Sequence, residues 1–102
     1  ITPLFGTVVF HDFHAPTINT PSETEQVLSA AKAAGLQEIV LLPECKMVGE
    51  DFSEYLKRVP GCYFLIGAGE KAPSLHTSFF DFPDAILLNA AHVMVQLALK
   101  CF

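Results

Sequence analysis

Charged residues are scarce in this sequence. They make up 17% of its 102 residues, whereas ordinary globular proteins contain about 25%. The six lysines and arginines are scattered along the chain, and the net charge is −5. A negatively charged protein without a basic patch is poorly suited to the phosphate backbone of nucleic acids. We therefore expect no nucleic acid among its partners.

Long apolar runs and cysteine pairs are also missing. No run approaches the roughly 20 apolar residues that a membrane helix needs. The first ten residues, ITPLFGTVVF, lack the charged region of a signal peptide. The three cysteines, Cys45, Cys62 and Cys101, are odd in number and form no CxxC motif. We therefore expect free thiols in a reducing compartment, which predicts a cytoplasmic protein that does not bind membranes.

Apolar residues, by contrast, are abundant, at 51% of the chain. The length allows one domain with a single modest core. Because a small domain has a large surface to cover, the apolar excess indicates that something else covers part of it. A fragment, a subunit or an oligomer would each explain this composition.

Helix signals bracket residues 21–34. Thr20 is a favourable N-cap, Pro21 occupies the first helical position, and Glu23 completes a capping-box pattern. Gly35 then follows as the residue type that commonly ends a helix. These signals predict a helix over residues 21–34.

Two further helices are predicted, over residues 50–59 and 83–100. In the first, apolar residues recur at the spacing of one helix face, and Pro60 ends the helix. In the second, apolar side chains cover most of the circumference. We therefore expect this last helix to be buried on most sides.

Three segments rich in β-branched and aromatic residues are predicted to be strands. They are residues 5–14, 37–42 and 62–66. Strands that alternate with helices are typical of an α/β domain. The predicted fold is therefore α/β, with helices packed on a small, mostly buried sheet.

Four stretches of the chain resemble a known family in their order and residues. They are APTINTP (15–21), MVGEDFSEYLKRVPG (47–61), CYFLIGAG (62–69) and LHTSFFDFPD (75–84). Through them, residues 15–102 resemble the C-terminal portion of the catalytic domain of M20-family metallopeptidases. The most similar branch is the amidohydrolases that cleave N-acyl amino acids, such as hippurate hydrolase and auxin-conjugate hydrolases. The resemblance implies that residues 1–14 are the last strand of a lid domain.

The resemblance also implies site residues. In that family a pair of divalent ions, Zn or Mn, lowers the pKa of a water bound between them, and a glutamate acts as general base. His76 corresponds to the family's C-terminal metal-binding histidine. Glu50 and Asp51 correspond to an acidic pair near the active site, and Asn19 to an asparagine of the return segment, so these three are candidate substrate-binding residues. Each also has a structural alternative. Glu50 and Asp51 suit the charge of a helix end, Asn19 suits a turn, and His76 could be an ordinary loop histidine.

The family's remaining ligands and its general base have no counterpart here. Nothing in residues 1–46 resembles the half of the enzyme that carries them, so no catalytic residue is assigned. A catalytic zinc needs about three protein ligands, and the chain alone is expected to bind no metal tightly. We therefore expect a fragment or subunit, inactive alone, whose partner is the missing N-terminal half or another chain. The substrate would be an N-acyl amino acid or a small peptide.

Two other interpretations stay open. The chain could be a non-catalytic binding module that retains the family's C-terminal fold, because its apolar excess suggests a partner surface. A weaker alternative is an independent metal site formed by His11, His14, His76 and nearby acids.

Overall fold

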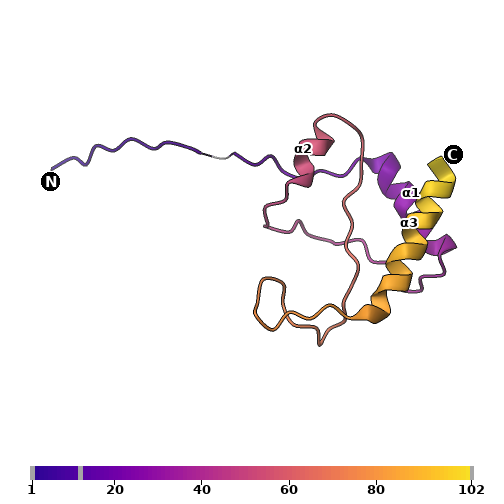
Figure 1. The fold of residues 1–102 in the computed structure, drawn as a ribbon. Helices are drawn as coiled ribbons and strands as arrows, with labels where there is room; N and C mark the ends of the chain where they lie inside the picture. The colour runs from indigo at the N-terminus through magenta and orange to yellow at the C-terminus, as the bar shows by residue number, and fades with distance from the viewer. Residues whose placement is uncertain (1, 12, 102) are drawn as a thin grey trace.

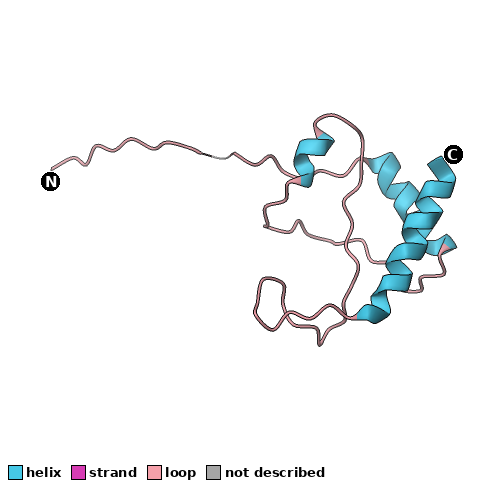
Figure 2. Cartoon of the chain, in the orientation of Figure 1, coloured by secondary structure: helices cyan, strands magenta, loops and turns pink. Residues whose placement is uncertain are grey.

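The computed structural model describes residues 2–11 and 13–101, without the side chain of Cys101. Its elements are helix α1 (Pro21–Ala33), helix α2 (Phe52–Leu56), the 3-10 helix η1 (Asp84–Ile86) and helix α3 (Leu87–Cys101). Loops connect these elements, and the N-terminal residues run away from the rest of the molecule (Figures 1 and 2). None of the described helices is long and apolar enough to cross a bilayer.

The predicted sheet is wrong for the part of the chain that the structure describes. Within residues 2–11 and 13–101 there are helices and loops but no strand. Segments 5–11, 37–42 and 62–66 have the composition of strands, yet they do not pair with one another. A strand is stabilised only when a second strand lies beside it and completes its hydrogen bonds. The composition of these segments suits a sheet, but in the described residues they form no backbone hydrogen bonds with one another.

Helix α1 confirms the prediction to within one residue. Thr20 precedes it with extended backbone, Pro21 is at its first position, and Gly35 follows with a φ of 83°. The amide of Leu36 donates to the carbonyl of Ala31 (3.1 Å), as expected where a left-handed glycine ends a helix. The predicted capping box does not form, because the Thr20 side chain makes no hydrogen bond to its own helix.

The other two predicted helices are only partly correct. Residues 50–59 form a helix only over Phe52–Leu56. Residues 83–100 divide into η1 and α3. The expected burial of α3 is wrong, since Val93 is its one buried apolar side chain among those described. Large apolar side chains of α3 that face solvent are Leu87, Leu88, Met94, Val95 and Leu99.

The core lies where α1 packs against α3 (Figure 1). Ala30 and Ala31 of α1 and Val93 of α3 are buried there. The small alanine side chains allow close approach of the two helices. A hydrogen bond from the Lys100 ammonium to the Ser29 hydroxyl joins them near the C-terminal end of α3.

Most of the apolar surface remains open to solvent. The accessible surface is 9192 Å², about 3,500 Å² more than the roughly 5,700 Å² of a folded protein of this mass. The radius of gyration is 18.5 Å, compared with about 13 Å for a compact domain of this length. The packed part of the chain is therefore small, and it depends on a few close contacts.

One test concerns the contact between α1 and α3. We expect Ala30→Leu to lower the free energy of unfolding by about 1–3 kcal/mol, because added methylenes cannot fit a packed site. Ala30 is 0% exposed, whereas Ala33, on the same helix, is exposed. Ala33→Leu is the matched control, with an expected change within about 0.5 kcal/mol. Urea unfolding followed by circular dichroism measures both, and equal effects would contradict the proposed core.

Candidate functional site

Four hydrogen bonds join residues 19–20 to residues 61–63. The Asn19 amide nitrogen donates to the Tyr63 carbonyl (2.8 Å), and the Tyr63 amide donates to the Asn19 Oδ1 (2.8 Å). The Thr20 amide donates to the Gly61 carbonyl (2.9 Å), and the Gly61 amide donates to the Thr20 Oγ1 (3.1 Å). We call this set the Asn19 clasp. It holds the start of α1 beside the segment that follows α2.

The ring of Tyr63 extends the clasp to the start of α2. A hydrogen bond from its hydroxyl to the Glu50 carboxylate raises the pKa of Tyr63, with smaller contributions from burial and from the negative charge of Glu50. The same carboxylate accepts a hydrogen bond from the Phe52 amide (3.3 Å). The Phe52 and Tyr63 rings lie 5.5 Å apart between centroids. Two predicted site residues thus interact with opposite ends of Tyr63: Asn19 with its backbone and Glu50 with its hydroxyl.

Asp51, the other acidic candidate, lies at the first position before α2. Its carboxylate does not cap the helix and instead approaches the Nδ1 atom of His14 (3.6 Å). The Asp51 side chain is 87% exposed and that of His14 is 56% exposed, so the pair contributes at most about 1 kcal/mol. This contact connects the N-terminal segment to α2.

His76 lies apart from these residues, in the loop between Gly69 and η1. Its φ is 62°, and it is the one non-glycine residue with positive φ among those described. Histidine is among the residue types that adopt this conformation more readily than most. The apolar neighbours of His76 do not pack this loop down, since Leu75 is 65% and Phe79 81% exposed. The His76 side chain is exposed and accessible to a ligand.

The residues present do not form a complete metal centre. In the described residues, no three histidine, cysteine or acidic side chains gather closely enough to hold an ion. His11, His14 and His76 therefore do not form the independent site considered from the sequence. His76 could supply one ligand of the three or so that a catalytic zinc needs. The metal-binding role of His76 and the substrate-binding roles of Glu50, Asp51 and Asn19 stay predictions.

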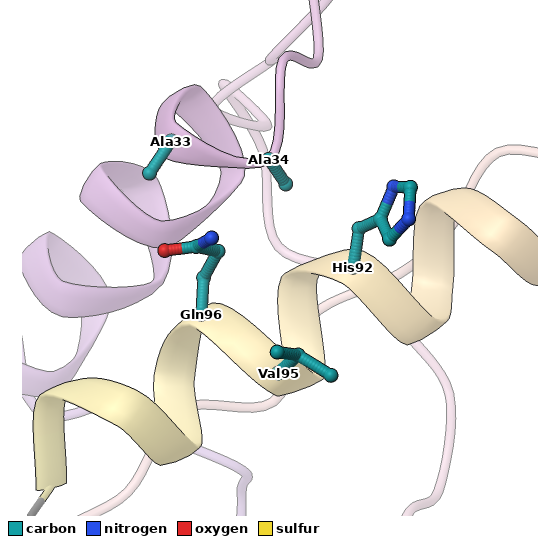
Figure 3. A pocket seen from close by; sticks show the side chains of 5 residues that line it. All are labelled: Ala33, Ala34, His92, Val95 and Gln96. Atoms are coloured by element: carbon teal, nitrogen blue, oxygen red, sulfur yellow. The ribbon is translucent and has the colours of Figure 1, made fainter.

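Two open hollows lie beside α3. The smaller, of about 280 Å³, is between the end of α1 and the middle of α3 (Figure 3). Its lining residues are Ala33, Ala34, His92, Val95 and Gln96. The larger, of about 480 Å³, extends from α3 to Phe52 and Tyr63. Neither contains His76, so neither coincides with the predicted metal ligand.

Sequence reasoning missed two participants in this arrangement, Tyr63 and His14. Tyr63 was read only as part of an apolar strand, because the residues at its two ends are distant in sequence. For His14 the sequence suggests only a weak metal site with His11 and His76, whereas the structure places it beside Asp51.

Residues 6–100 match the family model described as Peptidase family M20/M25/M40. The chain is 37% identical over 87 residues to YhaA of Bacillus subtilis, which carries the provisional name of an amidohydrolase. The match covers 80% of this chain and 22% of that protein.

Two relatives have names that state an activity. The chain is 30% identical over 93 residues to thermostable carboxypeptidase 1 of Saccharolobus solfataricus, which covers 87% of the chain and 23% of the relative. It is 30% identical over 89 residues to N-acetyldiaminopimelate deacetylase of Bacillus subtilis, again 87% of the chain and 23% of the relative. The chain thus spans less than a quarter of these relatives. No solved structure matches it significantly.

The Tyr63–Glu50 contact predicts a raised tyrosine pKa that depends on Glu50. The sequence has two tyrosines, so a Tyr55→Phe background isolates Tyr63. In that background, we expect Glu50→Gln to lower the pKa of Tyr63 toward its ordinary value, because the carboxylate stabilises the neutral hydroxyl. Tyrosinate absorbance against pH measures this shift, with Glu54→Gln as the control that leaves it unchanged.

The sign of the linked stability follows from the same shift. The neutral hydroxyl donates the bond, so its contribution is complete below the unfolded pKa of about 10 and is lost as pH rises through the raised folded pKa. The stability difference between the parent chain and Tyr63→Phe should shrink in that alkaline range. A difference that grows with pH would contradict the contact.

The Asn19 clasp predicts a large effect of removing one amide. Asn19→Leu keeps a similar side-chain size but removes two hydrogen bonds, which should lower the free energy of unfolding by about 1–3 kcal/mol. It should also accelerate hydrogen exchange at the Tyr63 amide. Asn89→Leu, at an exposed position of α3, is the control. Unchanged exchange at Tyr63 would show that Asn19 does not hold this segment.

Proposed function

Because the chain belongs to peptidase family M20/M25/M40, we propose that it is part of a hydrolase that cleaves the amide bond of N-acyl amino acids. The observation that carries the proposal is the family match over residues 6–100. The names of its relatives, a carboxypeptidase and a deacetylase, support hydrolysis of an amide. The N-acyl amino acid substrate rests on the resemblance of residues 47–52, MVGEDF, to the Met-Gly-Ser-Glu-Asp-Phe motif of that branch, from which Val48-Gly49 departs.

We assign His76 as the one metal ligand that this chain contributes. Its exposed side chain and left-handed backbone support that role, because strained backbone is concentrated at functional sites. The ion itself would be Zn or Mn. The other ligands and the general base would come from polypeptide outside these residues, so the chain alone would be inactive.

The three proposed substrate contacts differ in how free they are. Asp51 has the most available carboxylate, at 87% exposed. Glu50 already accepts a hydrogen bond from the Phe52 amide and raises the pKa of Tyr63, and both polar atoms of the Asn19 amide are used by Tyr63. Asp51 is therefore the best placed of the three to touch a substrate directly. Glu50 and Asn19 would act by fixing Tyr63.

The free thiols of Cys45 and Cys62 support a reducing, cytoplasmic location.

The second candidate function is a non-catalytic interaction module. The observation that favours it is the extent of exposed apolar surface on the N-terminal segment, the loops and α3. Extensive exposed apolar surface often marks a site that binds another protein. Supplying the metal ligands and the general base that lie outside this chain would distinguish the two functions. Part of a hydrolase would then be active, whereas an interaction module would not.

A chimera provides that test. Residues 6–100 would replace the matched segment of the Bacillus subtilis N-acetyldiaminopimelate deacetylase, and release of acetate from N-acetyldiaminopimelate would be measured with Zn²⁺ or Mn²⁺. We expect the chimera to hydrolyse this substrate. His76→Ala should lower its activity by more than about 10–100-fold, which is the loss expected when only a residue that hydrogen-bonds to a metal ligand is removed. A panel of N-acyl amino acids then tests the proposed substrate class.

His92→Ala is the matched control and should leave the chimera active. A folded chimera that stays active with His76→Ala would overturn the assignment of His76. A folded chimera without activity would favour the interaction module. The 102-residue chain alone, assayed in parallel, should show no turnover, and turnover would contradict the need for ligands from elsewhere.

A further inference from the structure

Helix α2 lies against the backbone that the Asn19 clasp holds. Phe52 is the first residue of α2, and its ring lies 5.5 Å from the Tyr63 ring between centroids. Gly61 is as close to the helix, because a Cβ atom at Gly61 would lie 3.0 Å from the Leu56 Cδ2 atom and 3.6 Å from the Phe52 Cζ atom. The side chains at the two ends of α2 thus contact the two residues whose backbone is hydrogen-bonded in the clasp.

The acidic residues before α2 are tied to the same helix. The Phe52 amide donates to the Glu50 carboxylate (3.3 Å), and the Ser53 hydroxyl donates to the Glu50 carbonyl (3.1 Å). Ser53 is 2% exposed, so little water competes for its hydrogen bond. The Glu54 amide donates to the Asp51 carbonyl (2.9 Å). The backbone on both sides of Asp51 is therefore fixed to α2, and Asp51 moves with the helix.

The carboxylate of Asp51 is available to a ligand. Its side chain is 87% exposed, and its contact with His14 spans 3.6 Å between exposed groups, where such pairs are weak. A carboxylate can accept a hydrogen bond from the amide N–H of an N-acyl amino acid. Where this acceptor lies depends on where α2 is held, because the backbone of Asp51 follows the helix.

We propose that Tyr63 is a positioning residue that holds Asp51 in place for substrate binding, through its ring contact with Phe52. The assignment rests on the proposed hydrolase function, which gives Asp51 a substrate to bind. Asn19 fixes the backbone of Tyr63, and the ring passes this constraint to α2. The Tyr55 ring also lies near that of Phe52, at 5.9 Å, but it belongs to the same helix and cannot fix it against the clasp.

Hydrogen exchange in the 102-residue chain tests whether Tyr63 holds Asp51. Tyr63→Leu removes the ring but keeps the backbone that Asn19 binds. The Glu54 amide, which is bonded to the Asp51 carbonyl, should exchange about 2–10-fold faster, as expected for loss of one aromatic contact. Tyr55→Leu is the matched control and should change this rate less than about twofold.

Two further variants keep this test decisive. If Tyr63→Leu fails to fold, Phe52→Leu removes the same ring contact from the side of α2 and should accelerate exchange at Glu54 in the same way. Tyr63→Phe retains the ring, so its Glu54 amide should exchange more slowly than that of Tyr63→Leu.

The chimera that carries residues 6–100 tests the effect on substrate. Tyr63→Leu should raise KM about 2–10-fold, the factor for one ordinary hydrogen bond. The value of kcat should change little, because a displaced Asp51 weakens binding without altering the metal ligands or the base. In an Asp51→Asn background, Tyr63→Leu should have no further effect on KM, since residues that act through one contact are not additive. Tyr55→Leu should leave KM unchanged.

Failure of the positioning role and failure of the hydrolase function give different results. Unchanged exchange at Glu54 in Tyr63→Leu would overturn the positioning role whatever the chimera does. So would an active chimera in which Tyr63→Leu and Asp51→Asn have additive effects on KM, or in which Asp51→Asn has none. A folded chimera without activity would instead overturn the hydrolase function, and with it any role of Asp51 in binding substrate.

Discussion

The pairing of the Asn19 side chain with the backbone of Tyr63 is the constraint on which this structure depends. A primary amide carries a donor and an acceptor side by side, so it satisfies an amide and a carbonyl of one extended residue as a neighbouring strand would. Few side chains of this chain are buried, and the contact joins regions 44 positions apart. Without it, the two hydrogen bonds between Thr20 and Gly61 would be what remains of the clasp.

Tyr63 carries this constraint from the backbone to the acidic start of α2. Its backbone is fixed by Asn19, its ring contacts Phe52, and its hydroxyl contacts Glu50. The orientation of the acidic pair therefore depends on residues from three separate stretches of the chain. The same motif that suggests an amidohydrolase is held by packing that the motif itself does not specify.

Features that depend on neighbouring residues could be predicted from the sequence, whereas features that depend on contacts between distant residues could not. Helix α1 was predictable because proline and glycine act on the residues beside them. The sheet was not, because a strand forms only when a partner lies alongside, and strand-like composition at residues 62–66 says nothing of a partner. The acidic pair and His76 are proposed as site residues through family resemblance alone, whereas the contacts of Asn19 and Glu50 with Tyr63 depend on tertiary structure that no local pattern encodes.

The small core also bears on how folding and association are linked. Ala30, Ala31 and Val93 are the buried apolar residues among those described, and such a core supplies little of the burial that must offset about 1–2 kcal/mol of backbone entropy per ordered residue. Any polypeptide that binds only the folded chain stabilises it by mass action. A partner that covers exposed apolar residues of the folded chain would therefore add to folding stability as well as to assembly.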